Sequence, residues 1–239
     1  MGASIHIWTI ALDEPGMSAS LVDVLSGEER VRAARLRTTE LRVRFVVAHG
    51  ALRTILSGYL GIPPNAVRFD TTESGKPYMP GAGLTFNLSR SDGLALCAIT
   101  VAGQVGVDIE RLRPVEDEDA IVHRYFAPAE MRQYAAVRSQ ERMAAFFCTW
   151  TRKEAFVKAI GSGLQRELSS FEVEVSPHVV CPRLTLDPED PQGAWNLRSF
   201  SPRPQYVAAV ALDRDIEALE FFEWSPDALA TIASHRSLH

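Results

Sequence analysis

The stretch that decides the fold is LALCAITVAGQVGVDIE, residues 94–110. Leu94 to Val101 is an almost continuous apolar run, which is typical of a strand buried on both faces. Val105 to Glu110 predicts a further strand, and Arg113-Pro114 ends it. The middle of the chain therefore holds strands, and the segments on either side decide what packs against them.

Helices are predicted before these strands. Ser26-Gly27-Glu28-Glu29 fits a capping box and predicts a helix from Ser26 to about Arg37. A second helix is expected to end near Ser57-Gly58, with a clear stop at residues 61–64, Gly-Ile-Pro-Pro. A strand is predicted at the start of the chain, with Ile5 and Ile7 on one of its faces.

The second part of the chain repeats this order. Pro128 suits the first position of a helix, and a longer helix is expected from about Gln140 to Ile160, stopped by Gly161-Ser162-Gly163. Short strands are then predicted between prolines, at residues 171–175, 183–186, 194–200, 206–212 and 217–223.

The order of elements predicts an α+β protein of two similar subdomains, each a small antiparallel sheet packed with helices. We expect an N-terminal subdomain at residues 1–105 and a C-terminal subdomain at residues 106–239. The similarity is one of element order, since no residues repeat between the halves. Ligand sites are common at such interfaces, so we expect the functional site between the two subdomains.

Composition narrows the class of protein. The 239 residues are 46% hydrophobic and 23% charged, which is ordinary for a globular chain. No apolar run approaches the roughly 18 residues of a membrane span, and the start of the chain lacks the features of a signal peptide. Cys97, Cys148 and Cys181 are widely spaced, which argues against a disulfide framework or a zinc site. We therefore expect a cytoplasmic protein without a membrane partner.

Charge is unevenly distributed. A net charge of −5 argues against a nucleic-acid partner. One early segment nevertheless carries a cluster of arginines, which could bind a small polyanion or an acidic protein surface, or could form a solvated helix face. The cluster comprises Arg30, Arg32, Arg35, Arg37, Arg42, Arg44 and Arg53, and an acidic run follows at residues 116–119.

Two carboxylates share a strand face in GVDIE, residues 106–110. Alternate residues of a strand point the same way, so Asp108 and Glu110 lie side by side. Neighbouring carboxylates repel unless a cation lies between them, and oxygen ligands of this kind suit Mg²⁺. An exposed polar strand face would give the same pattern.

A second candidate cluster lies on the helix near residue 150. Trp150, Glu154 and Lys158 form one i, i+4, i+8 row. A carboxylate beside an apolar stripe is costly to bury unless a metal or a lysine pairs with it. A surface Glu–Lys pair is the simpler interpretation of the same spacing.

Two further segments could contact phosphate. Gly75-Lys76-Pro77 places a lysine in a turn, and FNLSRS at residues 86–91 ends a strand in hydroxyls and an arginine. Each is also compatible with an ordinary polar turn.

Taken together, these segments resemble the 4′-phosphopantetheinyl transferase superfamily, in particular its larger two-subdomain type that serves peptide and polyketide synthases. The matching stretches keep the family's order: SGEERVRAARLR from Ser26, GKP at 75–77, FNLSRS at 86–91, GVDIE at 106–110 and WTRKEAFVKAIGSGL at 150–164. The resemblance covers roughly residues 26–175. It implies a pseudo-twofold relation between the subdomains and transfer of phosphopantetheine from coenzyme A (CoA) to a serine of an acyl or peptidyl carrier protein, with release of 3′,5′-ADP.

The resemblance also implies roles for individual residues. Asp108, Glu110 and Glu154 would hold Mg²⁺; Glu154, directly or through water, would take the proton of the carrier serine. Lys158 would stabilise charge on the pyrophosphate, and Asp108, Glu154 and Lys158 form the implied catalytic set. The implied CoA contacts are Lys76, Pro77, Ser89, Arg90, Lys153, Arg32 and Arg44.

This sequence departs from the family pattern at two positions. Relatives commonly have histidine where Arg90 stands, so we expect phosphate binding there to lose its dependence on pH. Some relatives have a basic residue at Glu29. Glu130 falls near a position that is often acidic, and its role is left open.

Two other functions fit part of the pattern. A Mg²⁺-dependent phosphohydrolase acting on nucleotides or CoA could use the same carboxylates, and a non-catalytic module could bind carrier proteins without metal ligands. We expect a monomer, because two subdomains in one chain can complete a site. The arginine-rich segment is the expected dock for an acidic carrier helix. The pathway served, whether fatty-acid, secondary-metabolite, lysine or siderophore synthesis, stays open.

Overall fold

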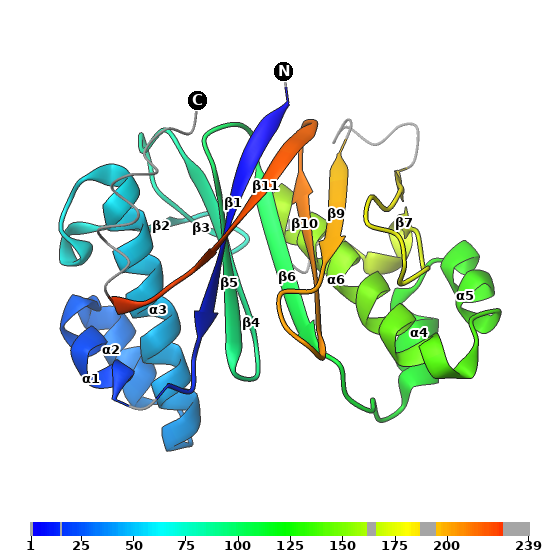
Figure 1. Cartoon of the computed structure of the whole chain (residues 1–239), viewed down its shortest axis with the longest axis horizontal. Helices are drawn as coiled ribbons and strands as arrows, with labels where there is room; N and C mark the ends of the chain where they lie inside the picture. The colour runs from blue at the N-terminus through cyan, green and yellow to red at the C-terminus, as the bar shows by residue number, and fades with distance from the viewer. Residues whose placement is uncertain (1, 15, 162–165, 187–194, 227–239) are drawn as a thin grey trace.

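The predicted α+β class is confirmed by a computed structural model, which describes residues 2–14, 16–161, 166–186 and 195–226. Two sheets lie side by side in the middle of the molecule, and a long helix covers the outer face of each (Figure 1). The layers are therefore helix, sheet, sheet and helix.

The first half begins with a strand and three helices. In chain order its elements are β1 (Ala3–Ala11), α1 (Met17–Leu21), the short 3-10 turn η1 (Val22–Val24), α2 (Gly27–Ala34), α3 (Thr39–Leu60), η2 (Pro64–Ala66), β2 (Asp70–Thr71), β3 (Pro77–Tyr78), β4 (Thr85–Ser91) and β5 (Leu94–Thr100).

The second half contains one long helix and mostly short strands. Its elements are β6 (Val105–Arg111), α4 (Glu118–Tyr125), α5 (Pro128–Ala135), η3 (Ser139–Glu141), α6 (Arg142–Ile160), η5 (Leu168–Ser170), β7 (Glu172–Val173), β8 (Leu184–Thr185), β9 (Asn196–Phe200), β10 (Tyr206–Leu212) and β11 (Ile216–Glu223).

The helix ends form where the sequence places them. Ser26 Oγ accepts the backbone N–H of Glu29 at 3.2 Å, and Glu29 Oε2 accepts the N–H of Ser26 at 2.8 Å, so the predicted capping box is confirmed. α3 and α6 end at Gly61 and Gly161, both in the left-handed conformation that glycine adopts without strain. Ser162, Gly163 and Leu164 of the quoted motif lie outside the described residues.

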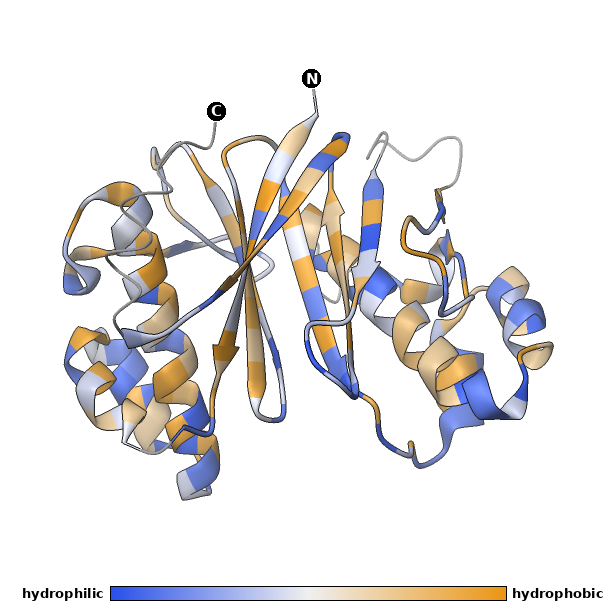
Figure 2. Ribbon diagram, viewed as in Figure 1, coloured by the Kyte–Doolittle hydropathy of each residue, from blue (hydrophilic) through white to orange (hydrophobic). Residues whose placement is uncertain are grey.

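β1 is buried on both faces. Trp8 and Ile10 pack with α3 in one core cluster, whereas Ile5 and Ile7 pack with the second sheet in another. Figure 2 shows the central strands mostly in the colours of apolar residues, while the outer helices carry hydrophilic stripes. Burying apolar surface on both sides of the strand joins the two halves into one body.

The first sheet departs from the antiparallel prediction. Its order is β11-β1-β5-β4, with β1 antiparallel to β5 but parallel to β11. The last described strand thus returns beside the first, as Figure 1 shows. A parallel partner requires a long crossover, and here that crossover is most of the chain. The division at residue 105 remains our proposal, and β11 crosses it.

The second sheet has the order β6-β10-β9 and is antiparallel throughout. α6 packs directly on it, and Gly106 makes this contact possible. A Cβ atom at Gly106 would collide with the carbonyl oxygen of Ala155 and the backbone of Ala159. The glycine of GVDIE therefore brings α6, with its charged row, against β6.

Two helices were missed by the sequence analysis. α1 is only five residues long, and α4 begins inside the acidic run that we treated as a charged segment. The tyrosine hydroxyl of Tyr134 donates to Glu118 at 2.6 Å, and Arg142 Nε donates to the same carboxylate at 3.1 Å, so part of that run is structural.

Within the described parts of the chain, neither long helix has a stretch apolar enough to cross a membrane.

Candidate active site

Five of the predicted site residues lie where β4, β6 and α6 meet, namely Ser89, Asp108, Glu110, Glu154 and Lys158. Two cavities open here and share Gly75 and Asn87 in their walls. The smaller cavity, of about 850 Å³, is lined among others by Lys76, Arg124, Tyr125, Trp150, Glu154, Val157, Lys158 and Leu168. The larger cavity, of about 1000 Å³, is lined among others by Arg30, Arg32, His49, Arg53, Arg68, Phe69, Pro77 and Arg90.

β4 holds β6 through three side chains on one face. Asn87 Oδ1 accepts the backbone N–H of Val107 at 2.9 Å. Ser89 Oγ donates to Asp108 Oδ1 at 2.8 Å, and Ser91 Oγ donates to Glu110 Oε2 at 2.8 Å. Alternate residues of a strand share a face, so the FNLSRS motif supplies this row and orients both carboxylates.

Asp108 is paired with Lys158. The ammonium nitrogen of Lys158 donates to Asp108 Oδ1 at 2.6 Å and to Ser89 Oγ at 2.8 Å. The other carboxylate oxygen, Asp108 Oδ2, is buried and has no hydrogen-bond partner among the described residues. A buried oxygen in this state is costly, and it is unusual in a stable core.

Glu154 lies one helical turn before Lys158 and faces the same charges. Burial raises its pKa, the nearby Asp108 raises it further, Lys158 lowers it, and Glu110 raises it again. The three carboxylates predicted to act together are therefore close enough to repel one another.

The donor set suits a hard cation, although the ligands do not converge. Within the described residues, no group of three or more His, Cys, Asp or Glu side chains is arranged to hold a metal ion. Glu110 is turned to Ser91 and to Arg113, whose guanidinium lies 3.1 Å away. The orphaned Asp108 oxygen and the crowded carboxylates nevertheless fit Mg²⁺ in chemistry.

Lys76 links the two halves. Its ammonium donates to the carbonyl oxygens of Val105, at 3.2 Å, and Ala159, at 2.8 Å. Ser74 Oγ also donates to the carbonyl of Gly161. Burial lowers the pKa of Lys76 to about 8. The GKP turn is thus tied to the end of α6, and a phosphate contact of Lys76 remains a prediction.

Arg32 and Arg90 are brought together on one aromatic ring. Each guanidinium carbon lies 5.5 Å from the centroid of the Phe45 ring. Burial lowers the pKa of Arg90, and the charge of Arg32 lowers it further. Two guanidinium groups that repel each other beside a cavity favour an anion between them.

The structure does not support the predicted CoA contact of Lys153. Lys153 and Glu130 both have 0% exposure, and their charged atoms lie 2.8 Å apart. The ammonium also donates to the carbonyls of Leu168 and Phe171, both at 2.7 Å, which uses all three of its protons. The role of Glu130, left open by the sequence, is to pair with this buried lysine.

The structure also does not support the predicted CoA contacts of Arg44 and Ser89. Arg44 donates to Asp13 at 2.6 and 2.8 Å and lies 2.8 Å from Glu40. Neither cavity has Arg44 among its described lining residues. Ser89 is buried, and its hydroxyl is engaged by Asp108 and Lys158, so it orients the site from behind.

An apolar wall of the smaller cavity was missed. Tyr125 and Trp150 meet edge to face, with ring centroids 5.5 Å apart, and Val157 and Leu168 continue the wall. Trp150 was recognised as part of the charged row, but Tyr125 belongs to the unpredicted helix α4. Asn87 was quoted within a motif without a role, although it lines both cavities.

Comparison with known proteins gives matches to one family. Residues 104–211 match the model of the 4′-phosphopantetheinyl transferase superfamily. The 4′-phosphopantetheinyl transferase HetI of Nostoc sp. is 38% identical over 213 residues, which cover 87% of each chain. The 4′-phosphopantetheinyl transferase Sfp of Bacillus subtilis is 27% identical over 210 residues, covering 86% of this chain and 91% of Sfp.

Similarity to solved structures is weaker. The holo-[acyl-carrier-protein] synthase of Thermotoga maritima is 20% identical, with a TM-score of 0.37, and the match covers 48% of this chain and 64% of that one. This similarity is too low to carry an argument. The long match to HetI is sufficient: the chain belongs to the 4′-phosphopantetheinyl transferase superfamily.

Proposed function

We propose that the protein transfers the 4′-phosphopantetheine moiety of CoA to a serine of an acyl or peptidyl carrier protein and releases 3′,5′-ADP. The observation that carries this proposal is the Asp108–Lys158 pair beside Glu154, next to two adjoining cavities that differ in character. Phosphoryl transfer depends mainly on positioning and electrostatic stabilisation, which such a cleft supplies.

CoA has a charged nucleotide end and a long, largely uncharged arm. The larger cavity is rich in arginine and suits the nucleotide end, with Arg32 and Arg90 as phosphate ligands and Pro77 in the wall. The smaller cavity has the aromatic wall of Tyr125 and Trp150 and suits the arm. The shared residues Gly75 and Asn87 then mark the position of the pyrophosphate.

Asp108, Glu110 and Glu154 are the side chains that would hold Mg²⁺. When bound, the ion would neutralise the pyrophosphate and stabilise the charge that develops as its bond breaks. Its presence would also relieve the repulsion among the three carboxylates and give Asp108 Oδ2 a partner. The carboxylates must rearrange to bring their oxygens together, since Glu110 is turned to Ser91 and Arg113.

Glu154 and Lys158 carry the proton and the charge in this proposal. The Glu154 carboxylate accepts the proton of the carrier serine, directly or through one water, as the serine oxygen attacks the β-phosphorus. Lys158 donates hydrogen bonds to the phosphate that leaves with 3′,5′-ADP. Both side chains line the smaller cavity, where the arm of CoA enters.

The carrier protein docks, we propose, on the exposed arginines of α2 and the segment leading into α3. Arg30, Arg35 and Arg37 are exposed there, as are Arg42 and the apolar Leu41 in the first turn of α3 and Val31 on α2, whereas Arg32 is assigned to the CoA phosphate. Arg44 and Arg53 are not part of this dock, because both are held in ion pairs. One chain supplies both cavities, so a monomer suffices.

The decisive experiment is intact-mass spectrometry of an apo carrier protein incubated with this protein, CoA and Mg²⁺. A mass gain of one phosphopantetheine is expected, and it should be lost with a chelator and in Glu154→Gln. Glu141→Gln, the same change at the other end of α6, is the matched control and should keep activity.

The same experiment separates the alternatives. CoA consumed without a modified carrier would indicate a phosphohydrolase. Carrier binding with intact CoA and no dependence on Mg²⁺ would indicate a non-catalytic binding module. Either result would overturn the transferase.

A further inference from the structure

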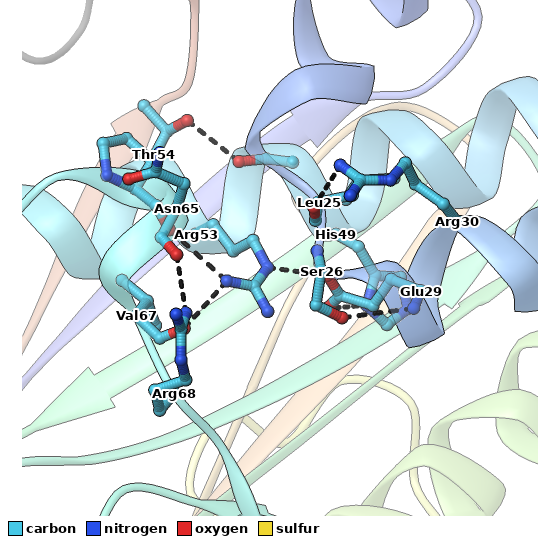
Figure 3. Close-up of polar contacts among 12 residues, drawn as sticks. Leu25, Ser26, Glu29, Arg30, His49, Arg53, Thr54, Asn65, Val67 and Arg68 are labelled. Atoms are coloured by element: carbon cyan, nitrogen blue, oxygen red, sulfur yellow. Dashed lines mark hydrogen bonds and ion pairs between the residues drawn. The ribbon is translucent and has the colours of Figure 1, made fainter.

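One carboxylate ties α2 to α3 at the edge of the larger cavity (Figure 3). Glu29 is that carboxylate, and it lines the larger cavity. It sits in the first turn of α2, and its side chain is only 13% exposed. An acidic side chain beside a cavity for a polyanion needs an explanation, because it would repel the ligand if it were unpaired.

The contacts of Glu29 neutralise its charge and use both of its oxygens. Oε2 accepts from Arg53 Nε at 2.7 Å and from the backbone N–H of Ser26 at 2.8 Å. Oε1 lies 3.4 Å from His49 Nδ1. Burial raises the pKa of Glu29, but the hydrogen bonds of His49, Arg53 and Ser26 outweigh it and bring the pKa to about 2.

Arg53 carries the connection into the loop after α3. Its Nη1 donates to the carbonyl of Val67 at 2.8 Å and to that of Pro64 at 3.4 Å. Its guanidinium carbon lies 5.2 Å from the centroid of the Phe69 ring. Arg53 itself is buried, so this guanidinium is an internal strut and not a ligand-binding group.

His49 carries the connection to the two-arginine site, by which we mean Arg32 and Arg90. The His49 ring stacks on Phe45, with centroids 4.0 Å apart and 24° between the planes. Phe45 is the ring against which both arginines lie. Arg32 is also three residues after Glu29 on α2, so whatever orients Glu29 orients the backbone that carries Arg32.

We propose that Glu29 is a positioning residue for substrate binding. Its carboxylate locks α2 onto α3 through Arg53 and His49, so that Arg32 and Arg90 lie together on Phe45 and grip a phosphate of CoA. The inference rests on the proposed function. It adds a residue that touches no substrate atom but sets the affinity of the site for its anion.

The sharpest variant is Glu29→Gln. Glutamine can still accept from the backbone of Ser26, so the helix cap is kept while the charge that holds Arg53 and His49 is removed. We expect the KM for CoA to rise about tenfold, the loss expected for a misaligned charged contact, with kcat at saturating CoA within about twofold of wild type. The Kd of 3′,5′-ADP, measured by calorimetry, should rise by a similar factor.

Two further variants separate positioning from a general loss of structure. Glu40→Gln removes another carboxylate from an arginine, on α3 but away from both cavities, and should leave both constants unchanged. In an Arg32→Ala background, Glu29→Gln should have a smaller effect than in wild type, because one of the two arginines that it positions is already absent. If Glu29→Gln melts below the assay temperature, Glu29→Asp is used in its place.

The outcomes are distinct. An unchanged KM for CoA and an unchanged Kd for 3′,5′-ADP in a folded Glu29 variant would overturn the inference, as would full additivity with Arg32→Ala. A lower kcat at unchanged KM would indicate only a smaller folded fraction, and it too would overturn the inference. Failure of the wild-type protein to bind 3′,5′-ADP or to modify any carrier would instead overturn the proposed function.

Discussion

α6 contributes two lysine–carboxylate pairs, which differ in their exposure to solvent and in whether every polar atom has a partner. Lys153 and Glu130 are closed to solvent, and every proton of the ammonium and both carboxylate oxygens are used. Lys158 and Asp108 are bonded as closely, at 2.6 Å, but the lysine is 29% exposed to a cavity and Asp108 Oδ2 has no partner in the described structure. A pair that satisfies itself holds the fold, whereas a pair with unused capacity can act on a ligand.

Lys153→Met should break the fully buried Lys153–Glu130 pair and give the largest loss of stability. It leaves the Glu130 charge buried and unpaired, which costs about 3–5 kcal/mol of unfolding free energy. Urea unfolding of the variant measures the loss. Adding Glu130→Gln should recover part of it, since the second change removes the buried charge; no recovery would mean that the two side chains do not act as a pair.

Lys158→Met should break the Lys158–Asp108 pair and reduce activity far more than stability. We expect the carrier-modification rate to fall by about 10²–10³-fold, because charge on the leaving phosphate loses its stabilising cation. The free energy of unfolding should fall by less than in Lys153→Met, since Lys158 is 29% exposed and water in the cavity can solvate the Asp108 carboxylate that is left behind. Comparable losses of stability in the Lys158 and Lys153 variants would remove the distinction between the two pairs.

A third paired carboxylate is Glu29, which contacts Arg53 and His49 at the edge of the larger cavity. The dependence of stability on acid pH tests what this pairing contributes. The pKa of Glu29 is lowered from 4.5 to about 2 in the folded protein. Above pH 5 the carboxylate is ionised in both states and the pairing contributes fully. As the pH falls from about 4.5 to 2, the unfolded chain binds the proton first, so on the order of 2 kcal/mol of stability is lost.

The Glu29→Gln variant has no carboxylate to protonate at this position, so comparing its stability with that of wild type measures the contribution of the Glu29 charge. The stability difference between wild type and variant should be largest near pH 6 and should shrink toward pH 2, as followed by denaturant unfolding at each pH. A difference that stays constant across this range would show that the charge of Glu29 does not contribute.

The smallest effect is expected at the proposed carrier dock. Arg35→Glu reverses an exposed charge, and the KM for an acidic carrier should rise by about two- to fivefold at low salt. The effect should fade as salt is added, since exposed charges are screened. Arg132→Glu on α5 is the control, and a larger effect there would move the dock to the other half of the molecule.

Much of the fold followed from local signals. The capping box at Ser26, the glycines after α3 and α6, and the apolar run of β5 each depend on neighbouring residues, and the structure has them within a few residues of the prediction. The parallel pairing of β1 with β11 depends on contacts between the two ends of the chain, and no local pattern encodes it.

The part of the site that depends on local periodicity could also be predicted from the sequence. Strand and helix periodicity placed Asp108 on the strand and Glu154 and Lys158 in one helical row, and the structure brings these groups together. Lys153 lies on the neighbouring face of the same helix, and its direction is set by Glu130, far away in sequence. Helical spacing alone gives no means to distinguish a lysine that faces a cavity from one that closes a core.

The return of β11 to β1 has a consequence for synthesis. β1 is synthesised before every other described element, and its final neighbour, Ile216–Glu223, is synthesised after all of them. Throughout translation one edge of β1 is open to other chains, which is a recognised route to aggregation. A fragment that stops before Ile216 would keep that edge open permanently, so the N-terminal half should not be expressible as a stable protein by itself.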